Sequence, residues 1–577
     1  MSTSLNWNDR NWSRLIPLQK CLEEFGSPTY VASLPRLKKN VEDFTGFTGS
    51  PERIYYPVKA NPTFAVLRAL ADQGVGADCS SIHEVNLARW AGIPWNRILY
   101  TSPVTDLKYA LRLLKTGATV IIDNEADLRA LDSMIHSGDT EVQPTGKVFV
   151  RLNPETKIEY SEKADYQDLT AHASHSSKFG IPSEDLLQAT DGIKLRISGL
   201  HLHVGTQMDH LDSFRAGLQT LHSCAELLLA NGHPVRTLDL GGGLGIAFGP
   251  EDRFPSIKEY TSSLLPLCDP TRFDYAVEPG HALIGDAVCL LTQILKIKPS
   301  RGKTWGVIDV GTEQLAKVSL LKWQHRVLTE NGELPWTGTD VLAGPLCFAG
   351  DTLLHQTNLS SLKEGDPLCI RDAGAYCFAL SNHFNGRYAP GMVLIDENGV
   401  LIRAHEPESP ALDTSIQSWV GFTENRESIA SHPEWKTQDA LLQAQEFYQL
   451  GSSYLWHLAA ADQYKITEVY HLGPQEFLVQ ILTRAAVPFI SAPFALRMIG
   501  DASIMASLRV LGLTLKSAPV WGRMITLECR DQIASGTTLP CRLSLSHPLT
   551  GISSGGSIWV RFDLADGKFV GQIELVF

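Results

Sequence analysis

A single lysine stands where a short apolar stretch meets a predicted helix near the N-terminus. Residues 55–58 read Tyr-Tyr-Pro-Val, Lys59 follows them, and a helical pattern starts after residue 62. In strand–helix barrels, active sites form at the carboxyl ends of the strands. An amine at that point can form a Schiff base with an aldehyde when its neighbours lower its pKa. A lone lysine at a loop is usually a surface residue, so the case for a reactive Lys59 depends on the other residues that accompany it.

Further polar side chains follow the later apolar stretches. They are Asp78, Ser81 and Glu84 at and after the end of 76–79, Arg151 and Asn153 at the end of 147–152, His201 and His203 within 197–204, Asp239 before Gly241, Gly242 and Gly243, and Glu278 before Gly280. A glycine run can offer backbone N–H groups to a phosphate, an imidazole can lie against a planar ring, and a carboxylate can hold a pyridine nitrogen protonated. Each group alone is more often structural, but together with Lys59 they describe a pyridoxal phosphate site.

The elements that must position these groups alternate along residues 53–278. Predicted strands lie at 53–58, 76–79, 98–101, 119–122, 147–152, 197–204, 237–240 and 275–278, and helical patterns between them include 82–91, 104–116, 125–135 and 213–231. Eight strand–helix alternations indicate an α/β fold of the (β/α)8 barrel type. An open doubly wound sheet gives the same alternation, usually with fewer strands.

Several motifs of this region recur in the order of a known family. They are Tyr56-Pro57-Val58-Lys59-Ala60-Asn61, Arg151-Leu152-Asn153-Pro154, Ser177-Lys178-Phe179-Gly180-Ile181, His201-Leu202-His203-Val204-Gly205-Thr206-Gln207, Leu240-Gly241-Gly242-Gly243-Leu244-Gly245, Glu278-Pro279-Gly280, Gly344-Pro345-Leu346-Cys347 and Asp372-Ala373-Gly374-Ala375-Tyr376. Over about residues 20–400 the chain resembles the fold type III pyridoxal-phosphate decarboxylases, the family of diaminopimelate and ornithine decarboxylases. This resemblance implies an alanine racemase-like barrel followed by a β-domain.

The resemblance also implies roles for single residues. Lys59 is expected to bind the cofactor as a Schiff base, His203 to stack on its ring, Glu278 to pair with its ring nitrogen, and Gly241, Gly242, Gly243 and Tyr376 to hold its phosphate. We place Asp78, Arg151 and Gly280 in the same cofactor site. Taken by itself, Cys347 reads as a small buried hydrophobe. By resemblance it reaches the cofactor of a partner subunit and returns a proton after CO2 leaves, which implies a homodimer with shared active sites.

Three departures from the family concern the far end of the substrate. The residue after Cys347 is usually acidic but is Phe348 here, the arginine usual after Glu-Pro-Gly is His281, and Arg387 lies near the Asn-Gly of the ornithine-type enzymes. An apolar ring cannot pair with an ammonium, and added cations favour an anion. We therefore expect a substrate tail that is neutral or anionic, and we place Phe348, Asp351 and Arg387 at that end of the substrate.

The chain is predicted to form five segments. Residues 1–35 are an arm joining the β-domain, 36–281 the barrel, 282–405 the β-domain, 406–462 a linker and helix, and 463–577 an α+β domain. Within the β-domain, strands are expected at 288–297, 304–309, 367–371 and 392–395. In the last segment, strand material at 467–483 precedes a helical pattern at 492–511 and four alternating runs, with Asp566-Gly567 as a hairpin signal. One helix and an antiparallel sheet resemble a hotdog domain, and Asp501 is the acidic residue of that helix. Such a domain would act on or hold an acyl thioester, or add dimer interface.

Composition narrows the class of protein. The 577 residues are 44% hydrophobic and 20% charged, with a net charge of −13 that argues against a nucleic-acid partner. Ten cysteines without a CxxC pair, no long apolar run and no signal peptide indicate a reduced, cytoplasmic protein without a membrane span or metal site.

The function that these residues favour is decarboxylation of an amino acid or amino-acid conjugate by a pyridoxal-phosphate-dependent carboxy-lyase. The extra domain suggests secondary metabolism, with a siderophore-like or thioester-linked precursor and a carrier protein as partner. A racemase of the same barrel type is an alternative that needs a second base opposite Lys59. A non-catalytic cofactor-binding relative is another, and it disagrees with the joint presence of Lys59, His203, Glu278 and Cys347.

Overall fold

The computed structural model describes two compact units of the chain, Met1–Pro407 and Glu408–Phe577. The described residues are 6–136, 145–154, 172–173, 175 and 177–408, together with six strands between residues 464 and 576. The helices expected at 435–462 and 492–511, the latter with Asp501, lie outside them. In the described part of the chain, no helix combines the length and apolar character needed to cross a bilayer.

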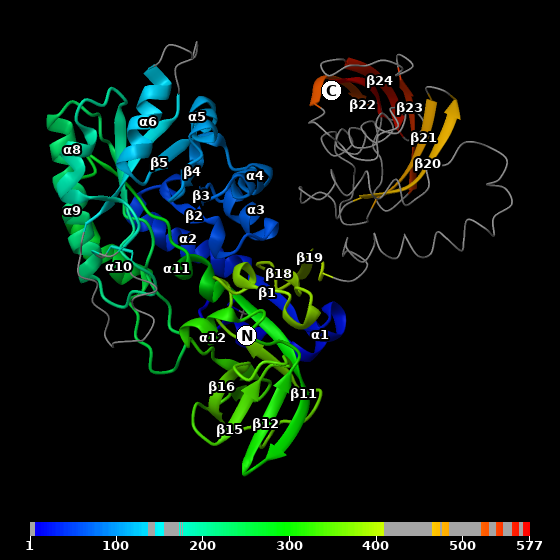
Figure 1. Ribbon diagram of the computed structural model, residues 1–577. Coiled ribbons are helices and arrows are strands. Elements are labelled where there is room, and N and C mark those ends of the chain that lie inside the picture. The colour runs from blue at the N-terminus through cyan, green and yellow to red at the C-terminus, as the bar shows by residue number, and fades with distance from the viewer. Residues whose placement is uncertain are drawn as a thin grey trace. The chain divides into compact units, whose positions relative to one another are not determined.

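The first unit contains a closed parallel barrel (Figure 1). Its strands are β2 (Tyr55–Pro57), β3 (Gly76–Cys79), β4 (Ile98–Thr101), β5 (Thr119–Ile122), β6 (Lys147–Asn153), β8 (Ile197–Leu202), β9 (Thr237–Asp239) and β10 (Asp274–Ala276), in this order around the sheet, with β7 (Ile181–Pro182) beside β6. A parallel bridge between Ile54 and Val277 joins the two ends. The predicted barrel is therefore confirmed, and the open sheet is excluded.

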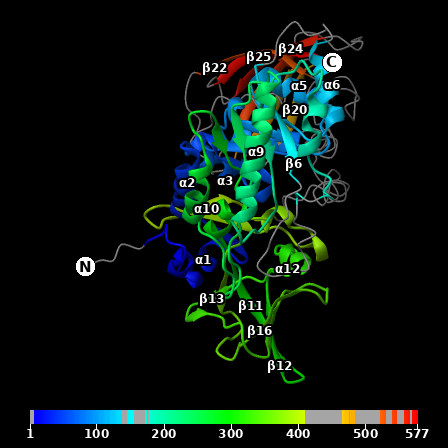
Figure 2. The same ribbon diagram turned by 90° about the vertical axis from the view of Figure 1, so that its left-hand side faces the viewer.

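Helices cover the outside of the barrel in Figures 1 and 2. They are α2 (Leu34–Thr48), α3 (Phe64–Asp72), α4 (Ile82–Trp90), α5 (Leu107–Thr116), α6 (Glu125–His136), α8 (Leu186–Thr190), α9 (Asp212–Ala230) and α10 (Ile257–Leu264). Helix α5 illustrates their local signals. The Asp106 side chain accepts the N–H of Tyr109 at its start, and Gly117, at φ 93°, ends it. Its buried side chains, Leu113 among them, pack in the main core together with Val120 and Ile122 of β5.

The β-domain is built around a strand from the N-terminus. Strand β1 (Thr29–Ser33) pairs antiparallel with β11 (Val288–Ser300) and parallel with β18 (Gly391–Ile395). Figure 1 shows this blue segment beside green and yellow-green strands from much later in the chain. The other strands are β12 (Lys303–Ile308), β13 (Val327–Thr329), β14 (Gly332–Glu333), β15 (Asp340–Ala343), β16 (Thr352–Thr357), β17 (Pro367–Ile370) and β19 (Leu401–His405). The N-terminal segment thus ties the barrel to the β-domain.

Five of these strands, β13 to β16 and β19, were not predicted from the sequence. Strand β14 has two residues and β13 has three, which is too short for a period-two pattern to be recognised. Strands β15 and β16 are longer, but their pairing shifts register twice. Such strands depend on partners that are distant in sequence, here β12 for β15 and β17 for β13.

The second unit contains a six-stranded antiparallel sheet. Its strands are β20 (Tyr464–Gly473), β21 (Glu476–Thr483), β22 (Trp521–Cys529), β23 (Thr538–Leu545), β24 (Ser557–Leu564) and β25 (Phe569–Val576). They lie in the order β20-β21-β23-β24-β25-β22. The stretch 467–483, expected as strand material, is divided between β20 and β21. The hairpin expected around Asp566-Gly567 agrees with the antiparallel pairing of Leu564 with Phe569.

Candidate active site

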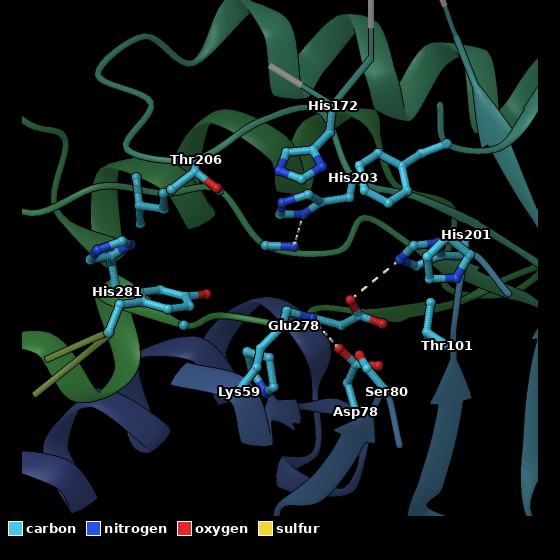
Figure 3. Close-up of a pocket in the computed structure, with 18 of the residues that line it drawn as sticks. Lys59, Asp78, Ser80, Thr101, His172, His201, His203, Thr206, Glu278 and His281 are labelled. Atoms are coloured by element: carbon cyan, nitrogen blue, oxygen red, sulfur yellow. Dashed lines mark hydrogen bonds and ion pairs between the residues drawn. The ribbon is translucent and has the colours of Figure 1, made fainter. Parts of the chain in front are cut away.

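A cavity of about 430 Å³ lies where the carboxyl ends of the barrel strands meet the β-domain. Its wall includes Lys59, His203 and Glu278 from the barrel, and Lys317, Trp323 and Tyr376 from the β-domain. Figure 3 shows His172 and His203 on one side of this space and Lys59, Asp78 and Glu278 on the other. The structure therefore brings together the residues that the sequence predicted for the cofactor, although they come from many different strands.

Lys59 follows β2 and faces this cavity, with 49% of its side chain accessible. Its Nζ lies 2.9 Å from Oδ2 of Asp78, which is on β3 opposite Pro57. Burial lowers the pKa of Lys59, but Asp78, Tyr376 and Glu278 together outweigh burial and raise the pKa above its usual value. The free amine is therefore protonated, and pairing with Asp78 holds it at the strand end.

Glu278 follows β10 and is only 6% exposed. Its Oε2 lies 3.3 Å from Nε2 of His201, while its Oε1 is buried without a hydrogen-bond partner among the described residues. A buried carboxylate oxygen without a donor is costly. Because Glu278 lines the cavity, a protonated ring nitrogen of a bound ligand would satisfy that oxygen.

His203 follows β8 and lies next to the glycine run. Its Nδ1 accepts the N–H of Gly242 at 3.0 Å, so the ring carries its proton on Nε2. Burial, together with the nearby His172 and Arg151, lowers the pKa of His203 well below its usual value. The imidazole is therefore neutral.

The glycine run after β9 has room for backbone only. A Cβ on Gly241 would lie 2.4 Å from the carbonyl oxygen of Leu202, and one on Gly242 would lie 2.3 Å from that of Glu278. Gly243 has φ 124°, which side chains rarely adopt. These contacts leave a loop without side chains at the cavity wall, which suits close approach of a phosphate to backbone N–H groups.

The remaining predicted cofactor residues lie around the same space. Arg151 on β6 is buried, pairs with Asp123 at 3.2 Å and lies over the Phe179 ring at 4.3 Å. Burial lowers the pKa of Arg151. Tyr376 has φ 57°, and a Cβ on Gly280 would lie 2.8 Å from its hydroxyl. Gly280 therefore leaves space for the Tyr376 side chain.

The structure puts the residues expected at the far end of the substrate on the β-domain. None of the described residues that line the cavity is a cysteine. Cys347 is exposed, its N–H donates to Oδ1 of Asn385 at 2.8 Å, and Phe348 beside it is 49% exposed. Asp351 differs from our expectation, because its two oxygens accept the backbone N–H groups of Thr312 and Leu346. Its carboxylate thus holds the turn that carries Cys347.

The two added cations also differ from what the sequence suggested. The Nε of Arg387 donates to Oε1 of Glu313 at 2.9 Å, and its guanidinium also contacts the carbonyl oxygen of Asp309. Glu313 is only 2% exposed, so this ion pair is largely internal. Burial and the neighbouring Lys317 lower the pKa of His281 well below its usual value, so His281 is neutral. Neither residue supplies a free positive charge to the cavity.

Sequence reasoning missed two groups at this site and named a third, Asp239, without giving it a role. His172 lies 4.6 Å, ring to ring, from His203, and burial lowers its pKa to about 4. Lys317 is fully buried and donates to the carbonyl oxygen of Ala375 at 2.7 Å. Asp239 is fully buried beside Glu278. Only Asp239 had a sequence signal, since it directly precedes the glycine run at a strand end.

The arrangement fits pyridoxal phosphate. An amine for the aldehyde, a buried carboxylate oxygen without a donor, a neutral imidazole and a glycine loop face one cavity of sufficient size. Among the described residues, no group of three or more His, Cys, Asp and Glu side chains is arranged to hold a metal ion.

Comparison with known proteins agrees with this fit. Residues 34–285 match the family model of the pyridoxal-dependent decarboxylases, pyridoxal binding domain. A diaminopimelate decarboxylase of Methanothermobacter thermautotrophicus is 31% identical over 411 residues, which cover 68% of this chain and 92% of the relative. That of Aquifex aeolicus is 29% identical over 408 residues, or 70% of this chain and 94% of the relative.

The fold is shared with solved structures. Diaminopimelate decarboxylase of Helicobacter pylori, solved in complex with L-lysine, superimposes with a TM-score of 0.61 at 22% identity, covering 68% of this chain and 98% of that one. The chain is a pyridoxal-phosphate-dependent amino-acid decarboxylase and belongs to the family that contains the diaminopimelate decarboxylases.

Proposed function

We propose that this enzyme decarboxylates an amino acid or amino-acid conjugate whose distal end is neutral, anionic or an amine masked in an amide. Lys59 holds the aldehyde of pyridoxal phosphate, Glu278 holds the proton of its ring nitrogen, and His203 covers its ring. Gly241, Gly242, Gly243 and Tyr376 bind its phosphate, and Asp78, Arg151 and Gly280 shape the same site. When bound, the cofactor supplies an electron sink for the bond to the α-carboxylate.

The single observation that carries the cofactor roles is the buried Oε1 of Glu278, which has no donor among the described residues. An oxygen of this kind on the wall of a cavity that also contains Lys59 calls for a ligand with a hydrogen-bond donor at that point. The nearby His203 ring is neutral, so it adds no positive charge that would compete with the ligand for the carboxylate of Glu278.

The experiment is reduction of the loaded enzyme with borohydride, followed by peptide mapping. Wild-type enzyme should carry the reduced cofactor on Lys59, and Lys59→Ala should carry none and lose activity. A variant at the exposed Lys115, Lys115→Ala, is the matched control and should keep both properties. Recovery of the adduct on another lysine of the wild-type enzyme would contradict the role of Lys59.

We also propose that the active enzyme is a homodimer in which Cys347 of one copy supplies the proton that replaces CO2 in the site of the other. The support is that Cys347 is exposed on the β-domain, while the described lining of the cavity includes no cysteine. Its neighbour Phe348 would then meet the far end of the substrate. The turn that carries both residues is held from inside by Asp351.

The proposed substrate preference is based on charge. The acidic residues in the described lining are Asp78 and Glu278, and Asp78 is already paired with Lys59. A distal ammonium left unpaired in such a place costs several kcal/mol. Phe348 offers it an apolar ring, so free diamino acids should bind poorly. Since Arg387 is paired with Glu313, it supports an anionic tail only if that pair opens.

A second candidate is diaminopimelate as substrate, which the names of the relatives favour. Its distal end carries both an ammonium and a carboxylate, so it would need an acid that Phe348 does not provide. Steady-state kinetics with diaminopimelate, lysine and ornithine separates the two candidates. Efficient turnover of diaminopimelate alone is expected if diaminopimelate is the substrate.

For the second unit we propose a hotdog-like domain that holds a substrate as a thioester, on a carrier protein in a secondary pathway such as siderophore assembly, or that adds dimer interface. The support is the six-stranded antiparallel sheet with a 37-residue interval, 484–520, between β21 and β22. The full-length enzyme should release CO2 from a thioester-linked amino acid faster than from the free one. Equal rates would contradict the thioester role.

A further inference from the structure

Asp239 is the carboxyl group of the barrel mouth that the proposed chemistry does not use. It ends β9, where it lies in register with His201 on β8 and Ala276 on β10. Its side chain is fully buried. Its Oδ1 accepts the N–H of Gly241 at 2.9 Å, and its Oδ2 has no hydrogen-bond partner among the described residues. One oxygen is therefore an acceptor for the glycine loop, and the other is free to carry a proton.

Asp239 and Glu278 lie at adjacent strand ends, where the N–H of Glu278 donates to the carbonyl oxygen of Gly241 at 2.7 Å, and interaction with Glu278 contributes to the raised pKa of Asp239. Each of the two groups has one oxygen with a neighbouring N–H and one oxygen without any such partner. Two adjacent carboxylates in a buried place cannot both be ionised at low cost, because like charges repel strongly there. A single proton on Asp239 removes the repulsion and gives its free oxygen a partner, while the ionised carboxylate of Glu278 can accept this proton and a second donor from the cavity side.

The surroundings of Asp239 decide which carboxyl group keeps the proton. The titratable groups that face it are Tyr55 on β2, Asp78 on β3, His201 on β8, Tyr260 on α10 and Glu278. Lys59 and Arg151, the cations of the neighbouring strands, are paired with Asp78 and Asp123. Burial, followed by the charge of Glu278, raises the pKa of Asp239 well above its usual value. Glu278, in contrast, opens onto the cavity.

We propose that Asp239 is a positioning residue that stays protonated and donates its proton to Glu278, so that Glu278 presents one oriented negative charge to the cofactor. In this arrangement Oδ2 of Asp239 carries the hydrogen, and an oxygen of Glu278 accepts it. His201 can donate from Nε2 to the same carboxylate. This inference rests on the proposed function for the contact between Glu278 and the ring nitrogen of the cofactor.

Asp239 also connects this charge to the phosphate loop. The same side chain that donates to Glu278 accepts from Gly241, the first residue of the glycine run. Movement of Asp239 would therefore shift both the carboxylate and the loop. Burial alone would also keep this carboxyl group protonated. A positioning role is therefore separated from a structural one by the contact with Glu278, which asparagine at this position preserves and alanine removes.

The test compares Asp239→Asn with Asp239→Ala in the full-length enzyme. Asparagine keeps an oxygen for Gly241 and an N–H donor for Glu278, so its cofactor dissociation constant at pH 7 should stay within about threefold of wild type. Alanine removes both contacts and should weaken cofactor binding about tenfold or more, as loss of a hydrogen bond to a charged group does. An exposed acid, Asp185, provides the control Asp185→Asn.

Infrared difference spectra at pH 8 report directly whether the carboxyl group of Asp239 is protonated. The wild-type minus Asp239→Asn spectrum should contain the C=O stretch of a protonated carboxylic acid, and the wild-type minus Asp185→Asn spectrum should not. As pH rises, cofactor binding should weaken more in wild type than in Asp239→Asn, because only wild type gains a second negative charge beside Glu278. Absence of the band, or an Asp239→Asn variant as weak as Asp239→Ala, would overturn the inference.

A further variant separates this inference from the proposed function. Glu278→Gln should weaken cofactor binding if Glu278 meets the ring nitrogen. Unchanged binding in Glu278→Gln would contradict the proposed cofactor contact, while the infrared band would still report on Asp239 alone. If Asp239→Ala does not fold, the band and the pH dependence of Asp239→Asn decide the outcome.

Discussion

The ammonium of Lys59 lies 2.9 Å from Oδ2 of Asp78, so a residue just after β2 is paired with a residue of the neighbouring strand β3. The side chain of Asp78 is inaccessible to solvent, while half of the Lys59 side chain faces the cavity. The acid is thus a fixed partner that holds the reactive amine in place. This pairing keeps the free amine of Lys59 charged.

Asp78→Asn should change the pH dependence of cofactor attachment. The charge of Asp78 raises the pKa of Lys59 in the folded protein, and only the neutral amine attacks an aldehyde. Removing that charge should therefore move the alkaline rise of the attachment rate to lower pH. Stopped-flow absorbance of the cofactor-free enzyme mixed with pyridoxal phosphate measures this shift.

The same pair predicts how stability depends on pH. Because the folded pKa of Lys59 is raised, the contribution of the pair is fully present below the unfolded pKa of lysine and is lost as pH rises through the folded pKa. Wild type and Asp78→Asn should thus differ in melting temperature at pH 7 and converge at strongly alkaline pH. A difference that persists there would mean that Asp78 stabilises the barrel in another way.

Gly242→Ala should weaken cofactor binding and lower stability. An added Cβ would lie 2.3 Å from the backbone oxygen of Glu278, so either the glycine loop or that strand end must move. Overpacking of this kind costs about 1–3 kcal/mol. Gly46→Ala, on helix α2, is the control, because its Cβ would lie 3.9 Å from the side chain of Thr261, an ordinary contact distance. Thermal melting and cofactor titration of both variants measure the contrast.

Cys347→Ala should keep cofactor binding and lower turnover, because the substituted group lies outside the described lining of its own cavity. If sites are shared between two copies, mixing inactive Lys59→Ala with Cys347→Ala chains should restore part of the activity, since one hybrid site would contain both groups. Turnover and sedimentation of the mixture measure this. Unchanged turnover of Cys347→Ala, or no recovery in an exchanged mixture, would contradict the shared site.

Phe348→Glu should improve free diamino acids relative to the true substrate. A carboxylate at this exposed position would pair with a distal ammonium that the phenyl ring cannot bind. Phe348→Gln, which is polar but uncharged, is the matched control. In wild type, lysine, ornithine and diaminopimelate should all have low kcat/KM. A value of roughly 10⁴ M⁻¹s⁻¹ or above for any of them would mean that another acid reads the amine.

Arg387→Ala should lower stability more than it raises KM. The guanidinium pairs with the buried Glu313, and its loss would leave that carboxylate without its partner, at a cost of about 2 kcal/mol or more. Adding Glu313→Gln to the same chain should recover much of the loss. A variant with an unchanged melting temperature but a strongly raised KM would instead assign Arg387 to the substrate.

Most of the barrel could be predicted from the sequence because its signals are local. Apolar stretches of four residues, such as β4 and β5, coincide with the expected strands, and α5 is bounded by its own cap residues. Lys59, His203 and Glu278 were identified because they stand at strand ends in recognisable motifs. The short strands β13 and β14 lacked such signals, because β13 is held by the distant strand β17 and β14 is held only by β13.

Only the tertiary structure decided what several charged residues do. Arg387 and His281 looked like free cations, but Glu313 pairs with one and burial neutralises the other. Asp351 looked like a substrate residue, yet backbone N–H groups occupy its oxygens. The sequence determined which side chains end the barrel strands. Their charge and availability depend on burial and on neighbours from other strands, which no local pattern in the chain contains.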